Sequence, residues 1–115
     1  MAKLEREDEA ALCAKVFKNL GVLSLKLNLQ GNRGWPDRVF LLPLRPLWFE
    51  FKRKDERPRK LQLHRIKTLR DLGYDAYWSY DYDESYRFIE TLYAARLSEI
   101  RDKEDGGTGL HRPVT

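Results

Sequence analysis

The sequence predicts an α/β domain in which a mixed four-stranded sheet is flanked by helices. Three stretches have apolar residues at helical spacing, and four have the alternating or aromatic character of strands. Their order along the chain is helix, three strands, helix, strand, helix. A tight turn makes neighbouring strands antiparallel, whereas a strand that follows a crossover helix returns parallel. We therefore expect both kinds of pairing in one sheet.

The first predicted helix spans residues 5–20. Its apolar side chains recur three to four positions apart, at Leu12, Val16, Phe17 and Leu20. Gly21 follows as a stop signal, and acidic residues crowd the first turns, where they suit the helix dipole.

Strict alternation in the next segment predicts a half-buried strand whose apolar face is built from Leu23, Leu25, Leu27 and Leu29. Turn-forming residues occupy positions 30–34. Two apolar runs, residues 39–42 and 47–52, are joined by a proline-rich turn, so we expect a hairpin.

The second half of the chain supplies two helices and one strand. Residues 61–72 predict a helix with Leu63, Ile66 and Leu69 as its apolar stripe, and residues 74–80 predict a short strand. A third helix begins near residue 81. Periodicity ends at residue 102, so we expect a domain over residues 1–101 and a flexible tail over residues 102–115.

Composition narrows the class of protein. The 115 residues are 42% hydrophobic and 35% charged, which is typical of one globular domain. The one cysteine, Cys13, allows no internal disulfide, and no apolar run is long enough for a signal peptide or a membrane span. We expect an intracellular protein with no membrane partner, cytoplasmic or nucleoid-associated, in the bacterial host cell if a phage encodes it.

Basic residues are concentrated between positions 33 and 70, although the net charge of the whole chain is only +4. Such a stretch favours a polyanion partner, here DNA. A solvated basic surface is the simpler alternative. The candidate DNA contacts are Lys26, Arg33, Arg38, Arg53, Lys54, Arg57, Arg59 and Lys60.

An acidic–basic group on the predicted hairpin carries the chemistry. Asp37 begins one strand, while Glu50 and Lys52 lie on one face of the next because strand residues alternate. Two carboxylates beside an ammonium group are costly on an apolar hairpin unless something binds them, and a divalent metal with a phosphate fits. The backbone carbonyl of Phe51 is a further candidate ligand. The alternative is an edge-strand salt bridge beside a turn cap.

These residues resemble a known family. Gly34-Trp35-Pro36-Asp37, Trp48-Phe49-Glu50-Phe51-Lys52 and Gln62 resemble the motifs of the VRR-NUC domain, within the PD-(D/E)xK nuclease superfamily, especially its short stand-alone phage and bacterial members. The resemblance implies a restriction-endonuclease-like αβββαβα core and a Mg²⁺- or Mn²⁺-dependent endonuclease. Asp37 and Glu50 would be metal ligands and Lys52 would assist catalysis.

The resemblance also implies a glutamate ligand from the first helix. Glu5, Glu7 and Glu9 all qualify, and Glu9 is favoured because it lies closest to the apolar stripe. Gln62 is expected to hydrogen-bond the attacking water, a phosphate or a catalytic carboxylate, or else to be an ordinary polar residue near a helix start.

Three functional hypotheses follow. The first is a structure-selective DNA endonuclease, a homodimer that resolves Holliday junctions in DNA repair or recombination, since stand-alone members of the family look like such dimers. Its variant is a nuclease that acts on flap, nicked or linear DNA. The second is a branched-DNA-binding module without catalysis, and the third is a protein-interaction domain that uses the aromatic C-terminal half.

Overall fold

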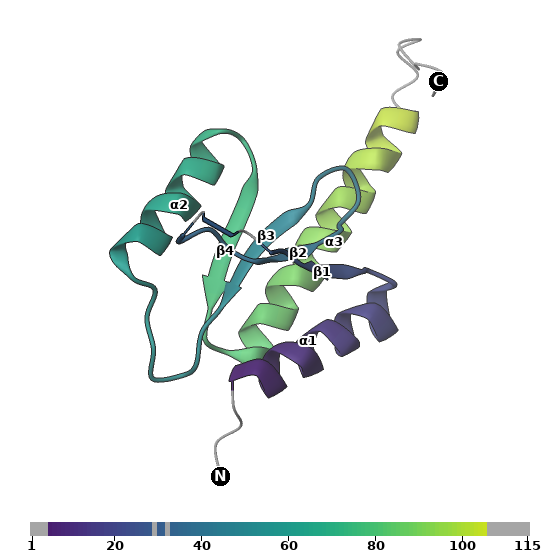
Figure 1. Cartoon of the computed structure of the whole chain (residues 1–115). Coiled ribbons are helices and arrows are strands. Elements are labelled where there is room, and N and C mark those ends of the chain that lie inside the picture. Colours follow the sequence, from purple (N-terminus) through teal and green to yellow (C-terminus); the bar gives the residue numbers. More distant parts are fainter. Residues whose placement is uncertain (1–4, 29, 32, 106–115) are drawn as a thin grey trace.

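The structure is a computed structural model that describes residues 5–28, 30–31 and 33–105. Its elements are α1 (Glu5–Leu20), β1 (Ser24–Lys26), β2 (Arg38–Phe40), β3 (Leu47–Phe51), α2 (Lys60–Asp71), β4 (Asp75–Ser79) and α3 (Tyr82–Asp105) (Figure 1). The predicted αβββαβα order is confirmed. The helix and strand types followed from local periodicity, which is a short-range property of the sequence.

The four strands form one mixed sheet in the order β1-β2-β3-β4. β1 and β2 are antiparallel, as are β2 and β3, while β3 and β4 run parallel on either side of the α2 crossover. The predicted mixed sheet is therefore confirmed. β3 lies in its interior, so the Glu50–Lys52 pair does not belong to an edge strand as the alternative interpretation assumed.

Helices cover the two faces of the sheet unequally. α1 and α3 pack on one face, where Leu12 and Val16 join the strand residues Phe40 and Phe49 and the α3 residue Ile89. α2 lies on the other face (Figure 1), where Ile66 and Leu69 pack with Ala76 and the indoles of Trp35, Trp48 and Trp78. The two clusters define an α1/α3 face and an α2 face, and strand residues alternate between them.

The predicted burial of the leucine face of β1 is wrong. β1 is limited to three residues, and Leu23 and Leu25 are 55% and 48% exposed. The register places Leu25 beside Val39 and Trp48, hence on the α2 face. α2 packs against β4 at the far side of the sheet, so the β1 end of this face has no helix over it. Phe17 and Leu63 are also exposed instead of buried, and Leu29 lies outside the described residues.

The third helix is longer than predicted. α3 continues to Asp105, so residues 102–105 are helical and not part of the expected tail, while residues 106–115 lie outside the described part of the chain. Its last turns carry many charged side chains, which obscured the helical period in the sequence. Among residues 5–28, 30–31 and 33–105, none of the helices has the length and apolar character needed to span a membrane.

A glycine seats the turn before Asp37 against α2. Gly34 has φ +84°, a left-handed conformation that disfavours other residues, and a Cβ there would lie 2.6 Å from Leu61 Cγ. The turn can therefore approach the first turn of α2 only through glycine. This contact brings the start of β2 close to the start of α2, where Gln62 lies.

Candidate active site

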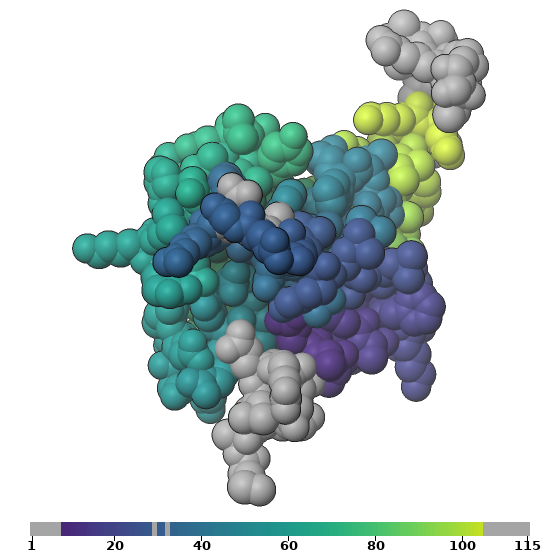
Figure 2. Space-filling view, viewed as in Figure 1, coloured from purple at the N-terminus to yellow at the C-terminus, as the bar shows by residue number. Residues whose placement is uncertain are grey.

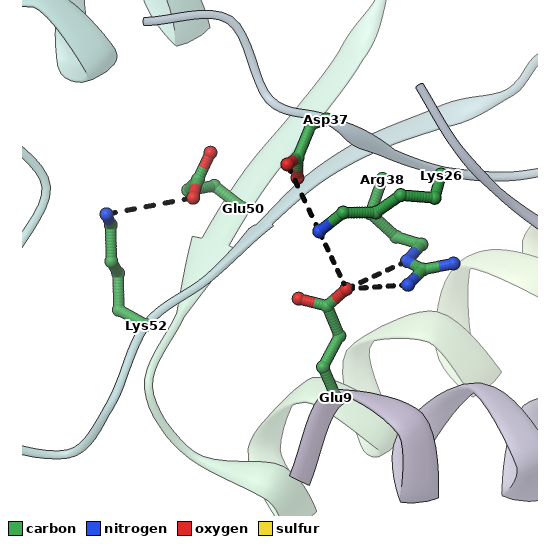
Figure 3. Close-up of polar contacts among 6 residues, drawn as sticks. All are labelled: Glu9, Lys26, Asp37, Arg38, Glu50 and Lys52. Atoms are coloured by element: carbon green, nitrogen blue, oxygen red, sulfur yellow. Dashed lines mark hydrogen bonds and ion pairs between the residues drawn. The ribbon is translucent and has the colours of Figure 1, made fainter. Parts of the chain in front are cut away.

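The β2–β3 pairing brings Asp37 and Glu50 together on the α2 face. Arg38 lies opposite Phe49 in this antiparallel pair, so one further step in the register places Asp37 opposite Glu50. Directly opposite residues share a face and have Cβ atoms about 4.5–5.5 Å apart. Figure 3 shows the two carboxylates on neighbouring strands. The hairpin thus juxtaposes the two predicted metal ligands.

Lys52 completes this pair from the end of β3. Its Nζ lies 3.7 Å from Glu50 Oε2, and the two side chains are only 11% and 13% exposed. The backbone N–H of Lys52 donates to Ser79 O at 2.9 Å, which continues the pairing with β4 and fixes the backbone there. A buried ion pair has a large desolvation cost, so this pair is weak evidence for a stabilising role.

Lys26 contacts Asp37 from the other side. Its Nζ lies 3.1 Å from Asp37 Oδ2 and 3.4 Å from Glu9 Oε2, so one ammonium group links carboxylates from α1 and from the start of β2 (Figure 3). Partial burial lowers the pKa of Lys26, but the hydrogen bond to Asp37 and the charge of Glu9 together outweigh it and raise that pKa above 10.5. Lys26 is therefore a cation at neutral pH.

Glu9 lies on the α1/α3 face, away from Glu50. Arg38 donates to Glu9 Oε2 from Nη2 at 2.7 Å and from Nε at 3.0 Å, and both side chains are largely buried. Arg38 follows Asp37 directly, so the two point to opposite faces of the sheet. In this structure the Glu9 carboxylate is bound by Arg38 and Lys26. Its role as a metal ligand stays a prediction. The structure does not describe the side chains of Glu5 and Glu7.

The donor set suits a hard divalent cation with few protein ligands. In the described part of the chain, no three acidic, histidine or cysteine side chains gather closely enough to hold a metal ion. Mg²⁺ commonly binds through one or two carboxylates and keeps several waters and substrate oxygens. Asp37 and Glu50, with the Phe51 carbonyl as the predicted extra ligand, match that description.

Gln62 lies at the start of α2, and its side-chain oxygen already accepts a hydrogen bond. Its Oε1 accepts a hydrogen bond from the backbone N–H of Arg59 at 2.8 Å, and the side chain is buried. This contact satisfies one of the unpaired donors at the helix start. The predicted interaction with water, phosphate or carboxylate therefore falls to the amide NH₂, which only donates.

The candidate DNA contacts divide into two groups. Arg38 is bound to Glu9, and Arg53 pairs with Glu56 and lies 3.8 Å from Asp55, so the structure gives each an acidic partner. The second, exposed group follows the site along the chain or lies on the turn before Asp37, and it comprises Arg33, Lys54, Arg57, Arg59 and Lys60. Lys26 is exposed as well, but it pairs with Glu9 and Asp37.

Two arginine–aromatic contacts close to the site were not singled out from the sequence. The Arg57 guanidinium lies 4.2 Å from the ring of Tyr80, and that of Arg65 lies 4.6 Å from the ring of Trp35, while Arg65 Nε donates to Arg33 O. The spacing of Arg65, three residues after Gln62 on one helix, was the available signal. These contacts orient two cations beside the turn and the basic loop.

Solved structures share this architecture, although no family model and no curated protein matches the chain. A structure described as "VRR_NUC domain" is 25% identical with a TM-score of 0.64, over 75% of this chain and 94% of that one. A second, "VRR_NUC domain protein", is 18% identical with a TM-score of 0.66, over 78% and 88%. With the αβββαβα order and the Asp37–Glu50 juxtaposition, these likenesses show that the chain has the VRR-NUC domain fold, which is consistent with the PD-(D/E)xK superfamily.

Proposed function

We propose that this chain is a Mg²⁺- or Mn²⁺-dependent DNA endonuclease that cuts branched DNA, and that it works as a homodimer that resolves Holliday junctions. The VRR-NUC fold indicates a nuclease. The observation that carries the proposal is the register of β2 and β3, which puts Asp37 opposite Glu50 with Lys52 beside them. Such an enzyme would act inside the cell, in the cytoplasm or at the nucleoid.

Asp37, Glu50 and the Phe51 carbonyl would hold the metal. When bound, a divalent cation polarises the scissile phosphodiester and lowers the pKa of a bound water. Lys52 then stabilises the negative charge that develops on the phosphate oxygens, because its ammonium is held beside Glu50 with little exposure to solvent. The Gln62 amide NH₂ donates to the phosphate or to a catalytic carboxylate, and so positions the substrate.

The exposed basic group would hold the DNA backbone. Lys54 and Arg57 belong to the loop that leaves the site after Lys52, and Arg59 and Lys60 lie at the start of α2. Contacts to the phosphate backbone do not distinguish base sequences, so the substrate would be selected by the shape and charge of its backbone. This agrees with a preference for branched over linear DNA.

Support for a homodimer comes from the open end of the α2 face. Several aromatic residues of the C-terminal half are used in packing, since Tyr77, Tyr82 and Tyr86 belong to the α1/α3 core. Leu23, Leu25 and Leu41 instead form an exposed apolar group on β1 and at the end of β2, where Leu41 N donates to Leu23 O. Two sites about a two-fold axis would match a junction with the same symmetry.

The test is cleavage of labelled four-way junction, flap, nicked and linear duplex DNA with Mg²⁺, with Mn²⁺ and with EDTA. Paired symmetric cuts in the junction, absent with EDTA and in Asp37→Asn, are expected. Cuts in another substrate would support the nuclease activity but would rule out the four-way junction as the preferred substrate. Sedimentation at micromolar concentration checks the dimer, and a monomeric mass would refute it.

A binding module without catalysis is the second candidate, favoured by one observation. Asp37 and Glu50 each have a lysine of the same chain as partner, which is also compatible with a structural pair. Tight, salt-sensitive junction binding with no cleavage in either metal, and no stabilisation of the fold by Mg²⁺, would establish this alternative.

A further inference from the structure

Three cations contact the carboxylates of the site, and they are held very differently. Arg38 grips Glu9 with two nitrogens of its planar guanidinium, and this pair is largely buried. Lys52 and Glu50 are also largely buried. Lys26 and Asp37, by contrast, are 56% and 42% exposed and are joined through single atoms.

The Lys26–Asp37 contact is therefore the one that can be exchanged. Exposed lysine–carboxylate pairs contribute little to stability, because solvent screens them and the side chains lose freedom when they pair. A guanidinium fork is preorganised and weakly hydrated, whereas an ammonium is a mobile point charge. Competition for the site carboxylates would break the Lys26 contact first and leave Glu9 with Arg38.

The position of Lys26 explains how it reaches both carboxylates. The register pairs Lys26 with Arg38, so the Lys26 side chain leaves the sheet on the α1/α3 face, where Glu9 lies. Its Nζ nevertheless contacts Asp37 Oδ2, at the open side of the sheet formed by the edge strand β1. A long, flexible side chain on an edge strand can leave one carboxylate without moving the backbone.

We propose that Lys26 is the internal counter-ion of the site, bound to Asp37 in the metal-free protein and released from Asp37 when a divalent cation binds there. This inference rests on the proposed metal-dependent function. Like charges a few ångströms apart repel, so a dication on Asp37 opposes the Lys26 contact. The exposed Lys26 side chain can move away, whereas burial holds Lys52 beside Glu50. Released Lys26 stays near Glu9 and turns to solvent, where a DNA phosphate can meet it.

Metal affinity, measured by titration calorimetry with Mg²⁺ and with Mn²⁺ and without DNA, tests the inference. Lys26→Met is expected to bind metal about 2- to 5-fold more tightly, because the metal no longer competes with Lys26 for Asp37. The factor is small because exposed ion pairs are weak. Lys26→Arg keeps the charge and is expected to bind no more tightly than the wild type. Lys67→Met is the matched control, because Lys67 forms an exposed ion pair with Asp71 on α2.

A direct readout follows the side chain itself. The protein is labelled with ¹³C at the lysine Cε positions, and the Lys26 NMR signal is assigned by its loss in Lys26→Arg. This signal is expected to shift when Mg²⁺ is added, with the same midpoint as in calorimetry. The Lys67 signal should not shift. Unchanged affinity in Lys26→Met, or metal binding without a shift of the Lys26 signal, would overturn the inference alone. A wild type that binds neither metal would remove the proposed metal dependence and the inference together.

Discussion

Two clusters of charged side chains in this molecule use the same chemistry for different ends. The site cluster comprises Glu9, Lys26, Asp37, Arg38, Glu50 and Lys52. The Arg96 cluster comprises Arg45, Asp75, Arg96 and Glu99. Both join carboxylates and cations from segments far apart in the sequence, yet only the first contains the motif residues.

The Arg96 cluster ties α3 to the β2–β3 turn and to the start of β4. Arg96 of α3 is 7% exposed and contacts Asp75 at the start of β4 and, at 3.8 Å, Glu99. Arg45, in the β2–β3 turn, binds Glu99 at 3.2 Å and approaches Asp75. Burial is the main reason that the pKa of Arg96 is lowered, with the charge of Arg45 adding to it. Every cation in this cluster is an arginine.

The type of cation distinguishes the two clusters. Arginine guanidinium groups hold carboxylates through two nitrogens in the Arg45–Glu99 pair and in the Arg38–Glu9 pair. Lysines contact the two carboxylates that face the proposed substrate, Asp37 and Glu50. The two carboxylates proposed to bind the metal thus have ammonium partners, whereas guanidinium groups hold Glu9 and Glu99.

The largest expected effect tests whether the lysine-paired carboxylates are the chemical ones. Asp37→Asn or Lys52→Ala should lower cleavage by at least about 100-fold, because each removes a charge that acts in the transition state. DNA affinity, measured by fluorescence anisotropy, should persist in both variants. Glu99→Gln, which removes a carboxylate charge from the other cluster, is the control and should cleave normally. Wild-type rates in either site variant would end the assignment.

Next in size is the stability of the Arg96 cluster. Asp75→Asn should lower the free energy of unfolding by about 1–3 kcal/mol, because it weakens the partner of a buried guanidinium. Urea denaturation measures this change. Cleavage by the folded variant should stay near the wild-type rate, and a large loss of activity at unchanged stability would merge the two clusters into one functional unit.

A smaller effect is expected for the arginine within the site cluster. Arg38→Met should lower the unfolding free energy by about 1–2 kcal/mol, because Glu9 loses two hydrogen bonds in a largely buried position. The loss of cleavage should be much smaller than in Asp37→Asn. Equal losses would show that the Glu9–Arg38 pair takes part in the chemistry.

The smallest effect concerns pH. The hydrogen bond from Arg45, with its charge, holds the pKa of Glu99 below 4.5. A carboxyl group with a lowered pKa stabilises the fold above its unfolded pKa, and this stabilisation is lost as pH falls through the folded value. The difference in melting temperature between wild type and Glu99→Gln should therefore be present at pH 7 and vanish well below pH 4.5. A difference that persists in acid would contradict this assignment.

Local sequence patterns predict the centre of the site but not its periphery. The hairpin pattern places Asp37, Glu50 and Lys52 together, because a tight turn sets the register of neighbouring strands and alternation sets their faces. The Glu9–Arg38 fork and the Lys26 bridge do not follow from such patterns. They join positions 29 and 17 residues apart, and the choice among several glutamates and basic residues depends on how α1 crosses the sheet.

The sequence by itself determined the order and type of the elements, the hairpin and the two opposed carboxylates, since periodicity and turn chemistry act over a few residues. Only the tertiary structure decided which faces are covered. Leu23 and Leu25 alternate as in a buried strand, but α2 lies over β4 and leaves both in solvent. Figure 2 shows β1 at the surface of the molecule. Burial depends on which distant helix packs on a face, and no local pattern encodes that.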